Sequence, residues 1–442
     1  MKTPISDFLK EYVNSGCVRL HMPGHKGVGN IEKYDITEIS GADSLYSASG
    51  IIRESELIAS DIFGADTFYS AEGSSLAIRA MLYLALTSRP SDREPCILAG
   101  RNAHKVFVSA AAMLGFKIEW IVGDGSYLST EISASALEEK LDSMDKPPIA
   151  LYVTSPDYLG CTSDIASLAD VCHKRDILLL VDNAHGAYLK FLSPSRHPID
   201  LGADMCADSA HKTLPVLTGG AYLHIRRGAC QDFKSRAKDA MALFGSTSPS
   251  YLILESLDRA NPYLAGKFAG ELLTYIDKIA AIKCDLQAYG YGIIGDEPMK
   301  ITLSPTPIGY SGTELAELLS KKGIEVEFSD PDYLVMMPAP CGGDALLDSI
   351  KGILLALNKR KPRAESAPHI SLPECVMSPR EAVLSATERV PVSESRGRIL
   401  GAVTVGCPPA VPILVSGERI NDDSIAAFKY YGIEYVSVIK QY

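Results

Sequence analysis

The sequence predicts an α/β fold in which helices cover a mostly parallel sheet. Between Thr67 and Ile225, short β-rich segments alternate with helical segments, a rhythm typical of repeated strand–helix units. Ile177 to Val181 is an uninterrupted aliphatic run, as expected for a strand that is buried on both faces. In such sheets, ligands bind at the carboxyl ends of the strands. We therefore expect the chemistry in the turns that follow these strands.

Local signals define the elements of this region in chain order. Phe68-Tyr69-Ser70 is a β-rich run before a turn at Gly73, and Ser74 to Thr87 has the spacing of an amphipathic helix. Ser163-Asp164 is a capping pair for a helix that ends near Lys174. The segments between them predict strands at 96–99, 117–122 and 149–154 and helices at 104–114 and 133–144.

The alternation ends near Thr247, and a different pattern follows. A long helical segment is predicted from Tyr251 to about Lys283, and a charged, proline-bearing stretch from Lys359 to Pro373 is a candidate linker. Between and after them we predict strands at 300–303, 325–328 and 333–337, helices at 313–322, 345–357, 379–386 and 422–431, and a closing strand.

Composition and charge exclude several classes of protein. The chain has 442 residues, of which 46% are hydrophobic, so it is not a disordered chain. The net charge is −11 and no stripe of basic residues with interleaved aromatics is present, so we expect no nucleic-acid partner. No apolar leader or spanning segment is evident, which predicts a cytoplasmic protein without a membrane partner. The ten cysteines form no C-x-x-C pair, and His21 and His25 lack further ligands nearby, so we predict no metal.

The most informative motif is Asp182-Asn183-Ala184-His185-Gly186, which ends the aliphatic strand, together with the later Ser209-Ala210-His211-Lys212. A lysine amine condenses with the aldehyde of pyridoxal phosphate (PLP), and a carboxylate keeps the pyridine nitrogen protonated, so that the ring can accept electrons. Ser209 and His211 are candidate phosphate donors. Taken alone, Asp182 and Lys212 would fit a structural salt bridge equally well.

Three further loops follow predicted strands. Gly73-Ser74-Ser75 opens a helix and can cradle a phosphate, although it also fits an ordinary helix cap. His104, in Arg101-Asn102-Ala103-His104, can stack on a pyridine ring or simply face solvent, and Ser155 offers a hydroxyl at the next strand end. Because all of these loops fit one ligand, their coincidence favours a PLP site.

In combination, these motifs resemble the ornithine/lysine/arginine decarboxylases of the aspartate-aminotransferase fold. The resemblance covers nearly the whole chain, from a P-G-H-K motif at Pro23 to a P-G-E-like motif at Ser416-Gly417-Glu418. It implies a seven-stranded PLP-transferase sheet with helices on both faces and a smaller C-terminal α+β region. It also implies an arm at 1–45, a PLP-binding domain at 46–283, a small subdomain at 284–360 and a C-terminal subdomain at 361–442. The chain looks like the short bacterial branch that lacks an N-terminal receiver-like domain, and a homodimer or higher assembly is implied.

The resemblance also assigns roles to residues. Lys212 would be the Schiff-base lysine, Asp182 the partner of the pyridine nitrogen, and His104 the residue stacked on the ring. His185 would lie near the cofactor oxygen or the substrate carboxylate, and His211 is a second candidate for proton delivery. The phosphate would be held by Gly73, Ser74, Ser75, Ser209 and His211.

The implied reaction is α-decarboxylation of arginine, lysine or ornithine to an amine, as in polyamine biosynthesis. A cationic substrate needs an anionic pocket, for which Asp43 and Glu72 are candidates beside Ser155. Asn183 stands where the family commonly has Glu, and the altered positions are expected nearer the substrate than the cofactor. Two other hypotheses stay open: another PLP reaction, such as transamination or elimination, and a catalytically silent PLP-binding homologue.

Overall fold

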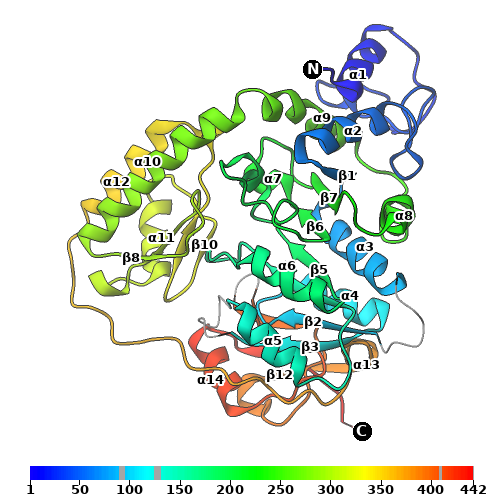
Figure 1. Ribbon diagram of the computed structural model, residues 1–442. Helices are drawn as coiled ribbons and strands as arrows, with labels where there is room; N and C mark the ends of the chain where they lie inside the picture. The colour runs from blue at the N-terminus through cyan, green and yellow to red at the C-terminus, as the bar shows by residue number, and fades with distance from the viewer. Residues whose placement is uncertain (89–94, 124–130, 408–410, 442) are drawn as a thin grey trace. The chain divides into compact units, whose positions relative to one another are not determined.

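The computed structural model describes residues 1–88, 95–123, 131–407 and 411–441 (Figure 1). The chain divides into two compact units. The first comprises residues 1–93, 149–155 and 165–272, and the second comprises residues 94–148, 156–164 and 273–442. The four-part division at 45, 283 and 360 stays a prediction from the sequence.

The central sheet has seven strands in the order β1-β7-β6-β5-β4-β2-β3. Neighbouring strands β4 and β5, β5 and β6, and β2 and β3 are parallel, whereas β7 is antiparallel to both β1 and β6. The predicted mostly parallel sheet is therefore confirmed, with β7 as the exception. The strands are β1 (Ala65–Ser70), β2 (Cys96–Gly100), β3 (Lys117–Ile121), β4 (Ala150–Thr154), β5 (Leu178–Asp182), β6 (Met205–Asp208) and β7 (Ala221–Arg226).

In the first unit, helices pack on the strands β1, β5, β6 and β7. Helix α3 packs on β6 and β7, α2 on β1 and α6 on β5. Almost the whole length of α3 is apolar, in keeping with its burial against the sheet. The helices are α1 (Pro4–Asn14), α2 (Ile51–Phe63), α3 (Gly73–Thr87), α6 (Ile165–Lys174), α7 (Ala210–Thr213), α8 (Gln231–Ala242) and α9 (Tyr251–Ala265).

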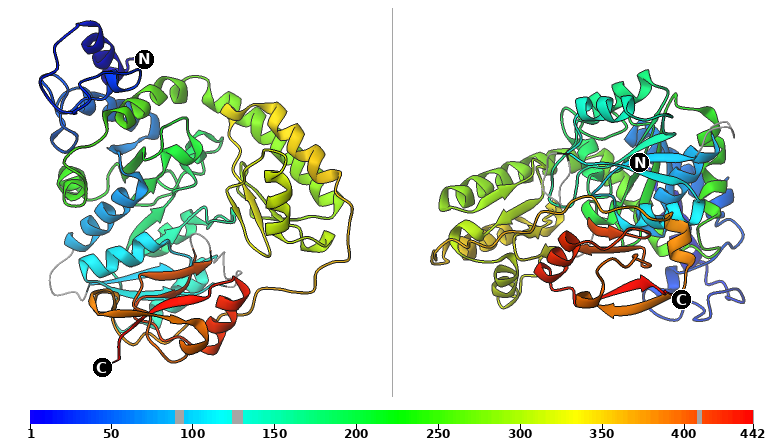
Figure 2. Two further views of the ribbon diagram at one scale, coloured as in Figure 1. Left: turned by 180° about the vertical axis from the view of Figure 1, so that it is seen from behind. Right: turned by 90° about the horizontal axis from the view of Figure 1, so that it is seen from below.

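The second unit contains β2, β3 and two further groups of elements (Figure 2). One is a four-stranded antiparallel sheet in the order β10-β11-β9-β8, and the other holds two two-stranded sheets around a small apolar core. The helices are α4 (Lys105–Leu114), α5 (Ala134–Asp142), α10 (Phe268–Tyr289, which begins in the first unit), α11 (Gly312–Ser320), α12 (Asp344–Leu355), α13 (Pro379–Leu384) and α14 (Asp422–Tyr430). The strands are β8 (Gly292–Ile294), β9 (Ile301–Ser304), β10 (Phe328–Ser329), β11 (Leu334–Met336), β12 (Thr387–Pro391), β13 (Thr404–Cys407), β14 (Val411–Val415) and β15 (Tyr435–Ile439).

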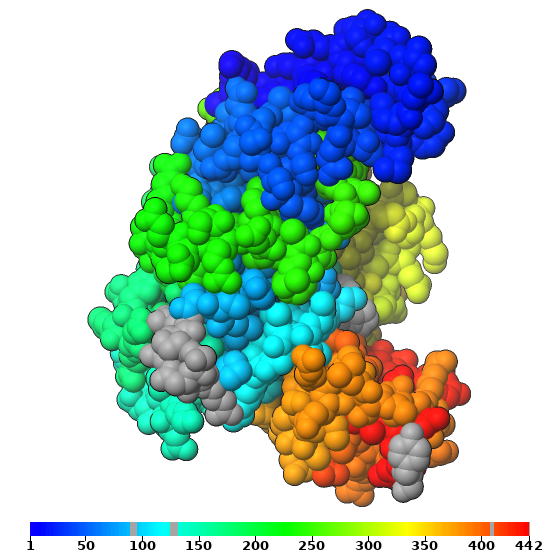
Figure 3. Space-filling model, turned by 90° about the vertical axis from the view of Figure 1, so that its right-hand side faces the viewer, coloured from blue at the N-terminus to red at the C-terminus, as the bar shows by residue number. Residues whose placement is uncertain are grey.

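Helix α13 packs against α4, and Figure 3 shows their orange and cyan surfaces side by side. Arg380 at the start of α13 donates from Nη1 to the carbonyl oxygen of Met113 near the end of α4, at 3.1 Å. Within the described ranges, we find no helix with both the length and the apolar character needed to cross a membrane.

Two predictions about elements were wrong in detail. The helical segment predicted from Tyr251 to Lys283 is two helices, because Gly266 after α9 leaves the helical conformation with φ −99° and ψ −93°. Pro262 inside α9 also lacks the N–H group that a continuous helix uses. The strand predicted at 325–328 is only Phe328–Ser329. The strands without a counterpart among the predicted ones are β6, β7, β8, β12, β13 and β14.

Candidate active site

Asp182 ends β5 and is buried, with 2% of its surface exposed. The Tyr152 hydroxyl donates to its Oδ2 at 3.0 Å, and the backbone N–H of Ala184 donates to its Oδ1 at 3.2 Å. Burial, with Asp182 beside it, raises the pKa of Tyr152 well above 10, so the phenol stays a neutral donor. Thr154, the register partner of Asp182, has a buried Oγ1 for which no hydrogen-bond partner is found among the described residues. The fixed carboxylate of Asp182, beside the Thr154 hydroxyl that lacks a partner among the described residues, can therefore bind the polar edge of a ring such as pyridine.

Lys212 lies on α7, the short helix that follows β6. Its Nζ contacts Nε2 of His185 at 2.8 Å, and His185 is in the turn after β5. The two turns meet because β5 and β6 are parallel neighbours, with Asp182 in register with Ala207. The structure thus brings together Asp182, His185 and Lys212 from two motifs that are distant in the sequence.

The N-terminus of α3 meets the segment before α7. The Ser209 hydroxyl donates to the Ser74 hydroxyl at 2.8 Å, and Gly73 N–H donates to the carbonyl oxygen of Gly219 at 2.7 Å. Gly73 has φ +71°, and a Cβ placed there would meet no atom within 4 Å. The first N–H groups of a helix lack intrahelical partners and favour an anion. The open space at Gly73, the N–H groups of the helix start that follow Gly73, and the hydroxyls of Ser74, Ser75 and Ser209 therefore fit the phosphate of PLP.

His211, the residue before Lys212, contacts the segment that precedes β7. Its Nδ1 lies 3.0 Å from the carbonyl oxygen of Gly220 and so carries the proton. Burial lowers the pKa of His211, with Lys212 acting in the same direction and the Gly220 bond opposing both. His211 is therefore neutral at neutral pH, with an unprotonated Nε2.

The acids predicted to face a cationic substrate both have backbone partners. Oε1 of Glu72 accepts the N–H of Ser246 at 2.6 Å. Burial and the charge of Glu72 raise the pKa of Tyr46 to about 12. A substrate contact of Glu72 stays a prediction.

Ser155 is buried, and its N–H donates to the carbonyl oxygen of Asp182 at 3.1 Å. A substrate contact of Ser155 also stays a prediction.

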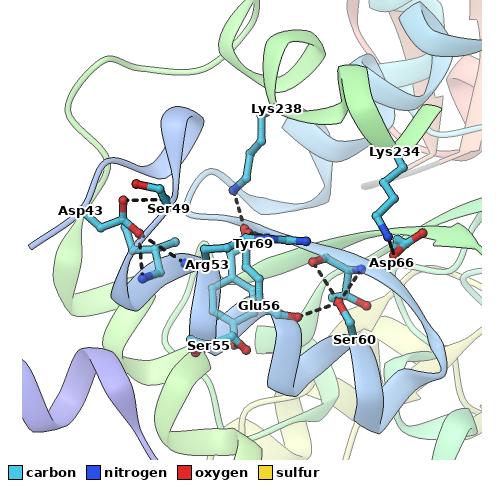
Figure 4. A network of polar contacts seen from close by, with 12 residues as sticks. Asp43, Ser49, Arg53, Ser55, Glu56, Ser60, Asp66, Tyr69, Lys234 and Lys238 are labelled. Atoms are coloured by element: carbon cyan, nitrogen blue, oxygen red, sulfur yellow. Dashed lines mark hydrogen bonds and ion pairs between the residues drawn. The ribbon is translucent and has the colours of Figure 1, made fainter. Parts of the chain in front are cut away.

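Asp43 organises the start of α2 (Figure 4). Its carboxylate accepts hydrogen bonds of 2.8–3.3 Å from five backbone N–H groups, while Asp43 itself has φ +68°. Burial opposes ionisation, but these bonds outweigh it and lower the pKa of Asp43. A substrate contact of Asp43 stays a prediction beside this capping role. The donors are Ser44, Ser49, Gly50, Ile52 and Arg53.

We expect Asp43→Ala to destabilise the first unit by about 1–2 kcal/mol, because the start of α2 loses its cap. Because the pKa of Asp43 in the folded protein lies below the ordinary 3.8, the ionised form stabilises the fold above that pH. This stabilisation is lost as the pH falls through the folded pKa. Thermal unfolding between pH 7 and 3 measures both effects. Asp43→Asn, which keeps one acceptor and tolerates positive φ, should lose less stability than Asp43→Ala. Equal stability of the unchanged protein and both variants would contradict the capping role.

His104 belongs to the second unit and is the N-cap of α4, where its Nδ1 accepts the Val106 N–H at 3.2 Å. Its stacking on the cofactor ring stays a prediction.

A buried polar cluster next to Ser209 was missed. Nε2 atoms of His197 and His224 lie 3.0 and 3.2 Å from Oδ2 of Asp208, and Asn183 Nδ2 donates to its Oδ1 at 2.7 Å. Burial opposes ionisation of Asp208, but the two histidines outweigh it and lower its pKa. Asn183 thus ties the turn after β5 to the end of β6. The sequence signal was the Asn at the family's Glu position; the two histidines have no spacing that points to Asp208.

A second missed contact joins two motifs that were recognised separately. Arg101 and Glu418 form a bidentate pair within the second unit, with both N–O distances at 2.8 Å. Arg101 is 6% exposed and Glu418 1%. The pair links the loop after β2 to the turn after β14.

Comparisons with known proteins identify relatives along almost the whole chain. The family model for the major domain of Orn/Lys/Arg decarboxylases matches residues 3–288, and the model for the C-terminal domain of these enzymes matches residues 363–437. Arginine decarboxylase of Halalkalibacterium halodurans is 30% identical over 96% of this chain and 92% of its own length, and that of Bacillus subtilis is 29% identical over the same shares. Among solved structures, lysine decarboxylase of Francisella novicida has a TM-score of 0.80 at 18% identity, covering 99% of this chain and 81% of its own. The constitutive lysine decarboxylase of E. coli has a TM-score of 0.77 at 19% identity, covering 99% and 82%.

The structural likeness confirms the predicted PLP-transferase fold. From both the sequence and the fold, this chain belongs to the Orn/Lys/Arg decarboxylase family.

Proposed function

We propose that the chain is a PLP-dependent decarboxylase of a basic amino acid, with arginine as its substrate. The observation that supports it most is the assembly of Asp182, Lys212 and the Ser74–Ser209 hydroxyl pair in one unit. The choice of arginine rests on the two relatives from Halalkalibacterium halodurans and Bacillus subtilis, which are named arginine decarboxylases.

Each part of the site has a separate task in this proposal. Asp182, fixed by Tyr152 and the Ala184 N–H, holds a proton at the pyridine nitrogen. Ser74, Ser75 and Ser209 hold the phosphate at the N-terminus of α3, and Lys212 carries the cofactor. When bound, PLP takes up the electron pair that is left when CO₂ departs.

The proton that replaces CO₂ comes from the Lys212–His185 pair. Nζ of Lys212 and Nε2 of His185 are 2.8 Å apart, so a proton passes between them without a bridging water. His211, neutral through its lowered pKa, accepts rather than donates at Nε2 near neutral pH. We assign His185 and Lys212 to proton delivery for this reason.

The other parts of the proposal concern the setting of the enzyme. We propose a homodimer as the minimal assembly, a cytoplasmic location and an amine product that enters polyamine biosynthesis. Light scattering coupled to size exclusion tests the assembly, and a monomer at micromolar concentration would contradict it.

Product analysis tests the reaction. The purified chain, supplied with PLP, is expected to convert arginine to the amine and CO₂ in equal amounts, with a kcat/KM at least about tenfold above lysine or ornithine. Labelled CO₂ and mass spectrometry of the amine measure this. Formation of a keto acid or ammonia without CO₂ would indicate transamination or elimination, and a bound cofactor without turnover of any basic amino acid would indicate a silent homologue.

A further inference from the structure

The second unit contains a cavity of about 770 Å³ along the edge strand β3. We call it the β3 cavity; its walls come from β3, the end of α4, the start of α13 and the turn after β14. None of the residues assigned above to cofactor or substrate lines it. Its volume lies in the range of sites for small organic ligands, about 300–1,000 Å³.

One wall carries an unsatisfied polar group. Ser416 is 1% exposed and lines the β3 cavity, and its Oγ has no hydrogen-bond partner among the described residues. A buried hydroxyl without a partner is unfavourable and needs an explanation, such as a ligand that supplies the missing bond. Ser416 also stands at the Pro position of the family's P-G-E motif, so this chain has a hydroxyl where that motif has none.

The charges around the β3 cavity favour an anion. Nζ atoms of Lys117 and Lys140 lie 2.7 and 3.3 Å from the carboxylate oxygens of Glu119, so two cations share one acid. Arg380 adds a third cation, held by its bond to the Met113 carbonyl. Among the described lining residues, Glu119 is the only acid, which leaves an excess of two positive charges.

The apolar part of the lining favours a flat molecule. The guanidinium of Arg101 lies over the Trp120 ring, 4.8 Å from its centroid, and the ring centroids of Phe107 and Trp120 are 6.1 Å apart in an edge-on arrangement. The indole is half-buried and also lines the β3 cavity, where Phe116 and Leu372 extend the apolar surface. Aromatic and aliphatic walls with a few polar groups are the usual composition of a small-molecule site.

We propose that the β3 cavity binds a small anionic molecule with a flat, apolar body. The body packs on Trp120, the carboxylate or phosphate group lies at Lys140 and Arg380, and the Ser416 hydroxyl donates to the ligand. This inference is independent of the decarboxylation proposal, because no residue is shared.

Trp120 is the only tryptophan in the chain, so intrinsic tryptophan emission reports on this cavity alone. We expect phenyl phosphate and phenylacetate, titrated into the full chain, to change the emission of Trp120 saturably. The probe that binds with the lower dissociation constant shows whether the cavity prefers a phosphate or a carboxylate. Benzylamine and benzyl alcohol, which share the ring but lack the negative charge, are expected to give no saturable change.

Matched variants locate the binding. Ser416→Ala is expected to weaken binding about 3- to 10-fold, because one hydrogen bond is lost. Lys140→Gln and Arg380→Gln are each expected to weaken it about 10-fold, whereas Lys429→Gln, an exposed cation of α14, should have no effect. The melting temperature of each variant is measured alongside. Binding of the uncharged probe as tightly as the anions, no saturable change with either anion, or equal binding by folded Lys140→Gln, Arg380→Gln and Ser416→Ala variants would overturn the proposal.

Discussion

Replacing Lys212 with alanine is expected to remove the absorbance band of lysine-bound PLP and to lower the turnover rate at least about 10³-fold. In the proposed function, the amine binds the cofactor covalently and, with His185, delivers the proton. Its Nζ is already within 2.8 Å of His185 Nε2, so the variant loses both functions at once. Absorbance spectra and steady-state kinetics on the same preparation measure the two losses.

Lys174→Ala is the matched control, because Lys174 is an exposed lysine at the end of α6 in the same unit. It should keep the band and the turnover. If the Lys212 variant kept either property, another lysine would have to carry the cofactor. An intact fold, checked by circular dichroism, separates this outcome from simple unfolding.

Glu418→Ala is expected to destabilise the second unit by about 3–5 kcal/mol, because it leaves the buried charge of Arg101 without its partner. Glu418 also accepts the Val415 N–H at 2.9 Å, so the turn after β14 loses a second bond. Denaturant unfolding followed by Trp120 emission measures the loss locally, since the indole stacks on the Arg101 guanidinium.

Glu374→Ala provides the comparison for this pair. Glu374 pairs with Arg419, the residue next to Glu418, at 2.8 Å, but the side chain of Glu374 is largely exposed and that of Arg419 is partly exposed. Exposed pairs contribute about 0–1 kcal/mol, so this change should be nearly silent. Equal effects of the two substitutions would show that the Arg101–Glu418 pair adds nothing beyond a surface contact. A double-mutant cycle that includes the Arg101→Ala/Glu418→Ala variant gives the coupling free energy between the two residues.

The loops of the candidate site were predictable because their signals are local. Asp182 follows an aliphatic strand that was predicted, whereas the strand before Lys212, β6, was not predicted. Because β5 and β6 are parallel neighbours, both turns lie at the same edge of the sheet. Gly73 and the two serines after it open a helix, which the sequence shows directly. The break at Gly266 was missed because an apolar helical pattern continues on both sides of it.

The amino-acid sequence was enough to predict the α/β class, the order of most strands and helices, and the family, together with the loops that are proposed to bind PLP. The contacts between polar residues that are distant in the sequence could be seen only in the folded chain. Arg101 with Glu418, Asn183 with Asp208, and Ser416 at the β3 cavity are examples. The reason is physical: hydrophobic periodicity encodes which face of an element is buried, but a single Asp, Arg or Ser has no period. Its partner is set by how the chain folds back over tens to hundreds of residues.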